Sequence, residues 1–457
     1  MGASLVGVYL LVVVFFAIVC FPNTIIADTD VSFHSSSFMK SALAPNAGEY
    51  VLQVEGPEFE LEIEGKQIDY EFDIDEVTKR VLELKNPFAW PVEIFKIHDF
   101  VDDSVVQYDK EKALSIILPA IDNHNVKAVI PQNASFICDV ATKTVSVKEE
   151  VKGNYLDVEK TSSSILSWIN SARRFLTLGE ENQLLPTLYA DDERIEPACA
   201  QANKMFLSCL KLVMGSANVA NIDANVLASW IILKEGYVAG LSDPDVEAWV
   251  SNLASKCDTV GKPRTYTTPY GKTCTVSGGD KIGWKIDQQG LIDEINRQVQ
   301  DGAQTTITVP CSSKLNDYNG AGGKDWGNRY VDVDLGSQYA RMYDANGSVI
   351  WQSAIVSGKP STPTPTGIYT VKSKASPTVL RGAPDPAHGV AAYESPVQYW
   401  MPFQGNAIGF HDADWQTAFG GNRWVEHGSH GCVNLPNSSA GSLYGIIQVG
   451  DIVVVHF

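Results

Sequence analysis

The sequence reads IGFHDADW at residues 408–415 and GSHGCVNLP at residues 428–436, and the stretch that these segments enclose holds one cysteine and three histidines. A thiol becomes a strong nucleophile when a base takes its proton, and attack on a carbonyl needs amide donors for the oxyanion that forms. Gly431 beside Cys432 leaves room for a carbonyl to approach the backbone. His411, at the end of an aliphatic run, is a candidate for the base. The pattern therefore favours thiol catalysis, although the segment alone does not decide which histidine serves.

Two other interpretations of Cys432 stay open at this point. One is an inert core thiol, but the neighbouring residues are too polar and too small for a packed core. The other is a zinc site in which His411, His427 and His430 join the thiolate, because imidazole and thiolate are common zinc ligands. That spacing is not typical of a closed zinc site, and the chain contains no CxxC pair. We therefore favour catalysis and predict no metal.

The last part of the chain is dominated by strand patterns. Residues 331–335 alternate apolar and polar side chains, and Asn-Gly at 346–347 indicates a tight hairpin turn. Residues 364–371 and 452–455 predict two more strands. We therefore expect residues 326–457 to form a mostly β domain.

This arrangement resembles the signature of the L,D-transpeptidase (YkuD-type) family. His411 is followed, after 17 residues, by SHGCVN at 429–434. The likeness extends to YWMPF at 399–403 and TPTG at 364–367, and it covers essentially all of residues 326–457. It implies a YkuD-like catalytic domain and a cysteine-dependent acyltransferase.

The resemblance also implies roles for individual residues. Cys432 would be the acyl-accepting nucleophile and His411 its general base, with the backbone carbonyl of Asp412 orienting the imidazole. Amides around Gly431 and Cys432 would form the oxyanion hole. The loop that shapes this hole would comprise Ser429, His430 and Gly431.

Substrate contacts are implied as well. The residues expected to make them are Tyr399, Trp400, Met401, Asp412, Trp415 and Asn434. Gln416 departs from the family pattern, because many relatives have Arg after the tryptophan, so a contact from this position to a substrate carboxylate stays open. His427 matches no family position, and we expect it to be a surface or structural residue.

The function implied by the resemblance is remodelling of peptidoglycan. Cys432 would attack the carbonyl of the third stem residue, a diamino acid, and release the terminal D-alanine. The thioester would then pass to the side-chain amine of another stem and make a 3→3 cross-link. This chemistry needs no metal or organic cofactor, and acylation by carbapenems is expected. Two alternatives remain: an L,D-carboxypeptidase, in which water resolves the same thioester, and an inactive wall-binding scaffold.

The middle of the chain contains an internal repeat. GNYLD at 153–157 and GWKID at 283–287 each precede an amphipathic helical pattern, and the offset is 130 residues. Each aspartate is expected to cap its helix. The sequence over 262–287 resembles the peptidoglycan-binding module that occurs in tandem upstream of some transpeptidases, whereas the likeness of the first copy is weaker. We therefore expect two α+β modules.

Local patterns predict further elements in these modules. Alternation on both sides of Glu64-Gly65 predicts a hairpin over 59–74, and a helix is expected over 75–84. A helical stripe runs from Cys199 to Val213. Ten residues of helix would hold the thiols of Cys199 and Cys209 about 15 Å apart, beyond the reach of a disulfide.

The N-terminal 27 residues contain no charged side chain. At about 1.5 Å per residue, a helix of this length would cross a bilayer core of about 30 Å. A cleaved signal peptide is the alternative, but a basic n-region is absent. We therefore expect a single-pass anchor in the cell membrane, with the catalytic part on the extracellular cell-wall side.

The overall composition excludes other classes of function. The 457 residues include 35 Lys and Arg against 54 Asp and Glu, a formal charge of −19. Nucleic acids and anionic lipid surfaces need a basic face, so we predict no nucleic-acid partner.

The expected order of the parts along the chain is as follows. We expect an anchor at 1–27, a juxtamembrane linker at 28–44, modules at 45–175 and 176–311, a flexible linker at 312–325 and the catalytic domain at 326–457.

Overall fold

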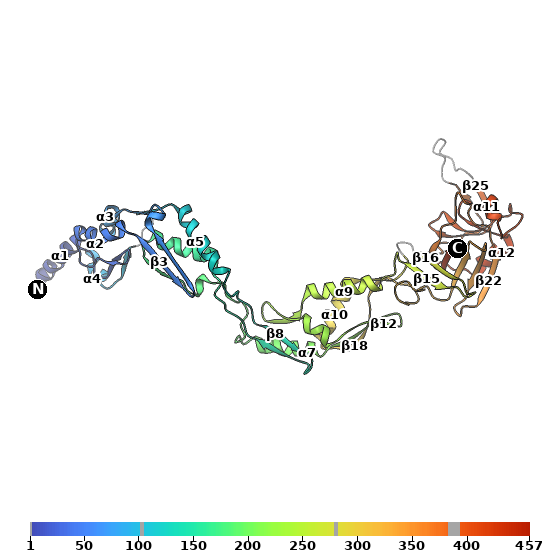
Figure 1. The fold of residues 1–457 in the computed structure, drawn as a ribbon, viewed down its shortest axis with the longest axis horizontal. Coiled ribbons are helices and arrows are strands. Elements are labelled where there is room, and N and C mark those ends of the chain that lie inside the picture. Colours follow the sequence, from blue (N-terminus) through green and yellow to red (C-terminus); the bar gives the residue numbers. More distant parts are fainter. Residues whose placement is uncertain (1, 101–104, 278–281, 383–393) are drawn as a thin grey trace, which may run out of the picture. The chain divides into compact units, whose positions relative to one another are not determined.

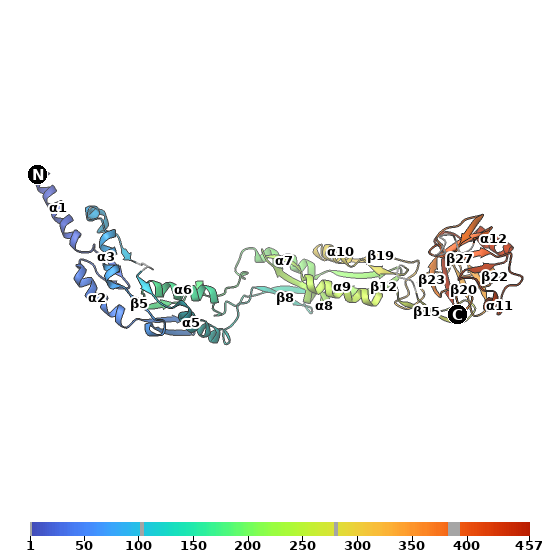
Figure 2. The same ribbon diagram turned by 90° about the horizontal axis from the view of Figure 1, so that it is seen from above.

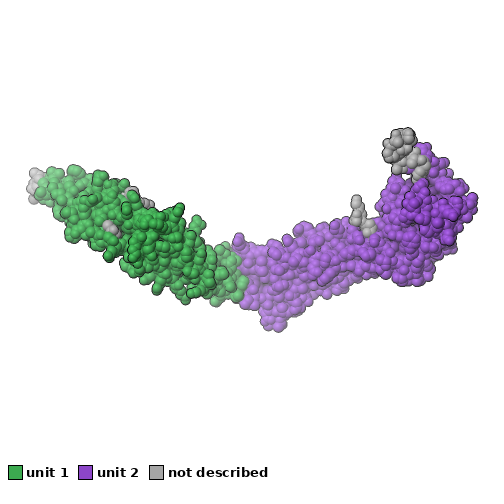
Figure 3. All heavy atoms as spheres, turned by 45° about the horizontal axis from the view of Figure 1, so that its top comes forward, with its two compact units in different colours: residues 1–135, 147–195 green, residues 136–146, 196–457 purple. Residues whose placement is uncertain are grey.

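The computed structural model describes residues 2–100, 105–277, 282–382 and 394–457. The chain divides into two compact units (Figure 3): residues 1–135 with 147–195, and residues 136–146 with 196–457. Each unit has buried apolar clusters of its own. Part of the sequence over 262–287 that resembles a peptidoglycan-binding module, residues 278–281, lies outside the described residues.

The first helix, α1 (Gly2–Ile18), is shorter than the sequence predicts. Its 17 residues span about 26 Å, and no helix in the described ranges combines the length and apolar character that crossing a membrane requires. Pro22 lacks an amide hydrogen and Asn23 has a φ of 58°, so helix is interrupted before β1 (Thr24–Ile26). The prediction of a continuous membrane helix through Ala27 is therefore wrong for this structure.

The predicted hairpin over 59–74 is also wrong. Strand β4 (Phe59–Glu64) pairs with the preceding β3 (Val51–Gly56), and the turn falls at Glu58, whose φ is 58°. A 3₁₀ turn, Gly65–Gln67, follows β4 and prevents an immediate return strand. The predicted helix is confirmed as α3 (Ile74–Leu84), which Asp73 caps by accepting from the Glu76 amide.

The remainder of the first unit covers this sheet with helices. Strand β10 adds to β3 in parallel, and α5 and α6 lie side by side (Figure 2). The other elements of the unit are α2 (Ser36–Gly48), α4 (Trp90–Glu93), α5 (Lys110–Asn125), α6 (Val158–Asn170), β2 (Thr29–Asp30), β5 (Glu71–Phe72), β6 (His98–Phe100), β7 (Val106–Gln107) and β10 (Phe175–Thr177).

The internal repeat is visible in the capping of two helices. Asp157 accepts a hydrogen bond from the Lys160 amide at the start of α6, and Asp287 accepts one from the Gly290 amide at the start of α10 (Gln288–Gln300). Both caps agree with the sequence prediction. Each helix also follows a two-stranded hairpin: β8 (Ser135–Asp139) with β9 (Thr144–Lys148), and β15 (Pro263–Thr267) with β16 (Thr273–Ser277).

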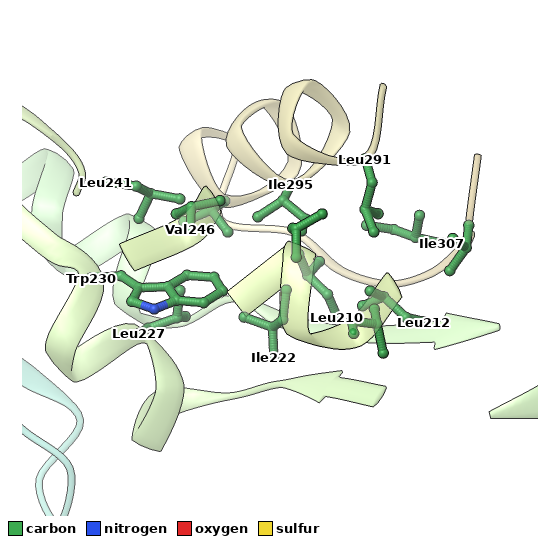
Figure 4. Close-up of a cluster of buried hydrophobic side chains, with 14 of the residues drawn as sticks. Leu210, Leu212, Ile222, Leu227, Trp230, Leu241, Val246, Leu291, Ile295 and Ile307 are labelled. Carbon is green, nitrogen blue, oxygen red and sulfur yellow. The ribbon is translucent and has the colours of Figure 1, made fainter. Parts of the chain in front are cut away.

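A large apolar core fills the second module (Figure 4). Helix α7 (Ile195–Phe206) ends before Cys209, which opens strand β11 (Cys209–Met214), so the predicted helix through Val213 is wrong. Alternate β11 residues, among them Leu210 and Leu212, point into the core with the two-residue period of a strand. None of the eight cysteines, all of which are described, forms a disulfide.

The other elements of this module surround the same core. They are β12 (Ala217–Ile222), α8 (Ala224–Trp230), β13 (Ile231–Lys234), β14 (Val238–Leu241), α9 (Asp243–Cys257), β17 (Lys285–Ile286), β18 (Gln304–Thr308) and β19 (Cys311–Ser313).

The hairpin β15–β16 packs against the C-terminal domain within the second unit. Arg264 of β15 and Asp325 are fully buried and form an ion pair of 3.0 Å. Sγ of Cys274 lies 3.2 Å from Nδ1 of His456, and Nε2 of that imidazole lies 3.0 Å from Oδ1 of Asp332. The segment expected to be a linker thus contributes a fully buried residue, Asp325, to this contact.

The C-terminal domain consists mainly of β-sheet (Figure 1). A five-stranded sheet has the order β22-β21-β20-β29-β23, a three-stranded sheet has the order β26-β27-β28, and apolar side chains of both share one core. Helix α12 packs against β27 and β22. The elements are β20 (Tyr330–Asp334), β21 (Tyr339–Tyr343), β22 (Val349–Ala354), β23 (Gly367–Thr370), β24 (Thr378–Arg381), β25 (Glu394–Val397), β26 (Trp400–Gln404), β27 (Ile408–Asp412), α11 (Arg423–His427), β28 (Val433–Leu435), α12 (Asn437–Ile446) and β29 (Ile452–His456).

Candidate active site

Two neighbouring strands bring the candidate thiol and base to one place. Cys432 directly precedes β28, which pairs in parallel with β27, and His411 lies opposite Asn434 in that pairing. Both strands are almost fully buried, so the sheet fixes the backbone at these positions. Sγ of Cys432 lies 3.6 Å from the carbonyl oxygen of Ala407, in the turn before β27.

The loop before Cys432 is held by its own hydroxyl group and by a second segment. Oγ of Ser429 donates to the carbonyl of Cys432 at 2.6 Å and accepts from the amide of Gly431 at 3.0 Å. Oγ1 of Thr364 donates to the carbonyl of Gly431 at 2.8 Å. Gly431 has a φ of 117°, a conformation that side-chain-bearing residues rarely adopt. The sequence TPTG therefore braces the loop that presents the thiol.

His411 is buried in a defined orientation. Its Nδ1 lies 2.8 Å from the carbonyl oxygen of Asp412, so Nδ1 carries the hydrogen and Nε2 is the acceptor. Its ring centroid is 6.0 Å from that of Trp400 and 5.8 Å from that of Trp415. Burial lowers the pKa of His411, an effect that the Asp412 carbonyl partly offsets. The imidazole is therefore neutral near pH 7 and able to take a proton.

The surroundings of Cys432 favour the neutral thiol. Burial raises the pKa of Cys432 above its usual value, and a backbone hydrogen bond from Gly409 partly offsets this shift. The thiol is therefore protonated near pH 7. Its activation needs a base that accepts the proton as the bond to substrate forms.

A cavity of about 420 Å³ opens beside these groups. Six residues singled out from the sequence line it: Cys432, His411, Ser429, His430, Trp415 and Asn434. Oδ1 of Asn434 is buried and has no hydrogen-bond partner among the described residues.

Four of the six residues expected to contact substrate do not line this cavity. Met401 is fully buried in the domain core, and the ring of Tyr399 packs on Tyr444 of α12. The carboxylate of Asp412 is buried and accepts from the amides of Tyr399 and Gln398, so it positions backbone and does not reach the cavity. The ring of Trp400 is tilted against the imidazole of His411, and Trp400 is not among the residues that line the cavity. Direct substrate contact by these four is therefore not supported.

The cavity also contains Gln416 and His427, which the sequence analysis names without assigning them a catalytic role, and Gly428 of the motif. The lining residues that the sequence analysis does not name are Leu380, Ser395, Ala407 and Arg423. One signal could have indicated Arg423: it is the only Lys or Arg among residues 382–457. A single basic residue in such a long stretch is a candidate for binding an anion, even where the local sequence contains no motif.

The candidate zinc ligands do not form a metal site. In the ranges that the structure describes, no three His, Cys, Asp or Glu side chains are grouped closely enough to hold a metal ion. His427 is half exposed on α11, and its nearest acidic neighbour is Glu426. The geometry is that of a thiol beside a neutral imidazole.

Comparisons with known proteins agree with this geometry. Residues 328–455 match the YkuD family, described as the L,D-transpeptidase catalytic domain, and residues 61–176 match a peptidoglycan-binding domain family. The latter match falls on the first module, where the sequence resemblance is weaker.

Solved structures and curated proteins are similar to parts of the chain. A structure of the Ldtfm–avibactam carbamoyl enzyme is 29% identical, covers 57% of this chain and 98% of its own, and has a TM-score of 0.50. A cysteine-to-serine mutant of Enterococcus faecium L,D-transpeptidase is 30% identical over 56% of this chain and 98% of its own, with a TM-score of 0.49.

The probable L,D-transpeptidase 3 of Mycobacterium tuberculosis is 31% identical over 100 residues, which are 21% of this chain. The match spans about a third of that curated relative, 36% of its length.

Proposed function

The chain belongs to the L,D-transpeptidase family, with a YkuD catalytic domain at its C-terminal end, and from this premise we propose that it forms 3→3 cross-links between peptidoglycan stems through a thioester on Cys432. The observation that carries the proposal is the shared cavity of Cys432 and His411, in which the imidazole presents Nε2 as an acceptor. The first module, which matches a peptidoglycan-binding family, would hold the polymer.

The first half-reaction uses the thiol and the imidazole together. The proton of the Cys432 thiol passes to Nε2 of His411 as sulfur attacks the carbonyl carbon of the third stem residue. The tetrahedral intermediate carries its charge on oxygen, and the amide of Cys432 is the donor we assign to it. The neighbouring Gly431 amide is already bonded to Ser429, so it shapes the loop and does not serve the oxyanion.

Collapse of the intermediate breaks the peptide bond. His411 returns its proton to the departing amine, so D-alanine leaves as a neutral amine and the acyl group stays on sulfur as a thioester. In the second half-reaction, the side-chain amine of another stem attacks the thioester, His411 takes a proton from that amine, and the thiol of Cys432 is restored. All groups are returned to their starting states, so the cycle requires no oxidant or cofactor.

Asn434 gives the cavity a further polar contact. Its buried, unpartnered Oδ1 is an acceptor for a backbone amide of the bound stem. Because stem peptides belong to the cell wall, we propose that the catalytic domain works on the outer side of the cell membrane.

The test is product analysis with the full-length protein and a disaccharide-tetrapeptide. We expect free D-alanine and a 3→3 dimer by mass spectrometry, and a single carbapenem adduct on Cys432. Cys432→Ala and His411→Ala should each abolish the release of D-alanine, the formation of the dimer and the carbapenem adduct. Cys209→Ala is the matched control, because this thiol is exposed on β11 in another module. Release of D-alanine without dimer would instead indicate a carboxypeptidase, and no release by folded protein would overturn the proposal.

A further inference from the structure

We propose that Arg423 of helix α11 binds a carboxylate of the substrate and so selects anionic stems for the Cys432 cavity. The inference rests on the proposed transpeptidase function, which it extends by naming a recognised group and the residue that recognises it. No sequence motif assigns a role to Arg423, and its position in the cavity comes from the fold.

The charge around the cavity is the first argument. The chain has a formal charge of −19, yet among the residues that the structure describes no Asp or Glu lines this cavity. Arg423, the only Lys or Arg in the last 76 residues, does line it. A cavity whose described lining has one permanent cation and no carboxylate, in an acidic protein, is complementary to an anion.

The bonding of the guanidinium is the second argument. Its Nε donates to Oε1 of Gln416 at 3.4 Å, and one of its terminal nitrogens donates to Oγ1 of Thr417 at 3.1 Å. Both acceptors are neutral, and no carboxylate of the described residues forms an ion pair with it. A guanidinium has five N–H groups in a planar fork, so donors remain for a second, charged acceptor.

The support behind Arg423 is the third argument. Nε2 of Gln416 donates to the carbonyl of His427 at 2.7 Å, so the amide is fixed at one end to the C-terminal end of α11. Its other end accepts from Arg423, which stands at the start of the same helix. Gln416 is therefore a positioning residue that holds the guanidinium half-buried at the cavity wall.

The ligand is a carboxylate close to the scissile bond, and a stem offers two. One is the terminal carboxylate of the departing D-alanine, and the other is the second carboxylate of a third residue such as diaminopimelate. Both would accept the planar fork of Arg423 through two parallel hydrogen bonds. Four synthetic tetrapeptide stems separate them: the parent with both carboxylates, one amidated at the terminus, one amidated at the third residue, and one amidated at both.

The experiment measures kcat/KM for cleavage of the bond after the third residue, in full-length native protein and in Arg423→Gln. Removing a charge-assisted contact should lower kcat/KM for the parent stem roughly tenfold to a hundredfold, mainly through KM. For the native protein, kcat/KM on one of the singly amidated stems should be lower than on the parent stem by a similar factor. For Arg423→Gln, kcat/KM on that stem should equal its kcat/KM on the parent stem. The stem that shows this pattern identifies the carboxylate.

Controls separate recognition from folding and from chemistry. Arg297→Gln removes the same charge from an exposed ion pair on α10 and should leave kcat/KM unchanged. Alkylation of Cys432 by iodoacetamide, an uncharged reagent, should proceed equally in native protein and Arg423→Gln if the thiol and His411 are intact. Gln416→Ala, which releases Nε of Arg423, should raise KM for the parent stem by a smaller factor.

The outcomes also distinguish the two proposals. Equal losses for Arg423→Gln on all four stems, or no loss on any, would overturn carboxylate recognition while leaving the transpeptidase function standing. If the native protein cleaved none of the stems, the proposed function itself would fail.

Discussion

The carbonyl oxygen of Asp412 lies 2.8 Å from Nδ1 of His411, so the residue that follows this candidate base also sets the tautomer of its imidazole. The carboxylate of the same Asp412 points elsewhere and accepts from the amides of Gln398 and Tyr399. Asp412 thus orients the imidazole of His411 through its backbone carbonyl. Through its carboxylate it also holds the backbone amides of the two residues that precede β26. The orientation of the base is therefore coupled to the stability of the sheet.

The pH dependence of activity should report the burial of His411. Burial lowers the pKa of this imidazole, and a general base is active only in its neutral form. The acid limb of kcat/KM against pH should therefore have its midpoint below the ordinary histidine value of about 6.5. Burial also raises the pKa of Cys432, so thiolate should accumulate only above the ordinary titration range of a cysteine. An acid limb centred above 6.5 would contradict this assignment of the base.

A methyl group at Gly431 should displace the loop that presents the thiol. The residue has a φ of 117°, and an added Cβ would lie 3.1 Å from Cδ1 of Ile408. We expect Gly431→Ala to lower kcat for D-alanine release by at least roughly tenfold, because small misplacements of a nucleophile are costly. Gly445→Ala in α12 is the matched control, since nothing lies within 4 Å of its added Cβ. Equal activity of both variants would contradict the role of the loop conformation.

Sequence patterns indicate the candidate reactive residues of the site more readily than the other residues that line its cavity. A short motif indicates Cys432 and His411 as candidates, and the structure places both at one cavity. Met401 and Tyr399 belong to the same motif, yet their side chains pack into the domain, since strand alternation decides which face a residue takes. Arg423 was missed because a turn and a short helix bring it to the cavity, and no local period encodes that arrangement.

In the fold as well, features set by neighbouring residues are predictable from the sequence, whereas contacts between distant segments are not. The caps at Asp157 and Asp287 were predictable, because an N-cap acts within three residues of its own helix. The partner of β4 was not, because alternation identifies a strand without saying which neighbour it pairs with. The end of α7 before Cys209 was not predictable for a related reason. Residues Cys199 to Val213 fit a helical period, but the last of them form β11, which is stabilised by parallel pairing with β18, almost a hundred residues away.

Removing the carboxylate of Asp412 should destabilise the catalytic domain and reduce activity together. Asp412→Ala leaves the amides of Gln398 and Tyr399 without their acceptor at the start of β26. The expected cost is about 1–3 kcal/mol per amide left unpaired, seen as a lower midpoint in urea denaturation. Asp414→Ala serves as control, because this exposed carboxylate has only a 3.4 Å contact with Asn437. If Asp412→Ala kept the native midpoint, the side chain would have no structural role.

The buried ion pair between Arg264 and Asp325 should be the contact that fixes β15–β16 to the C-terminal domain. Both side chains are fully buried, and Asp325 also accepts from the hydroxyl of Thr259 at 2.6 Å. Asp325→Ala would leave an uncompensated guanidinium in the interior, so we expect a loss of about 3–5 kcal/mol in the free energy of unfolding. The double change Arg264→Met with Asp325→Leu should recover much of this loss, since it removes the stranded charge. Glu294→Ala, which breaks an exposed pair with Arg297, should change the urea midpoint little. A double variant as unstable as Asp325→Ala alone would show that packing, and not the unpaired charge, causes the loss.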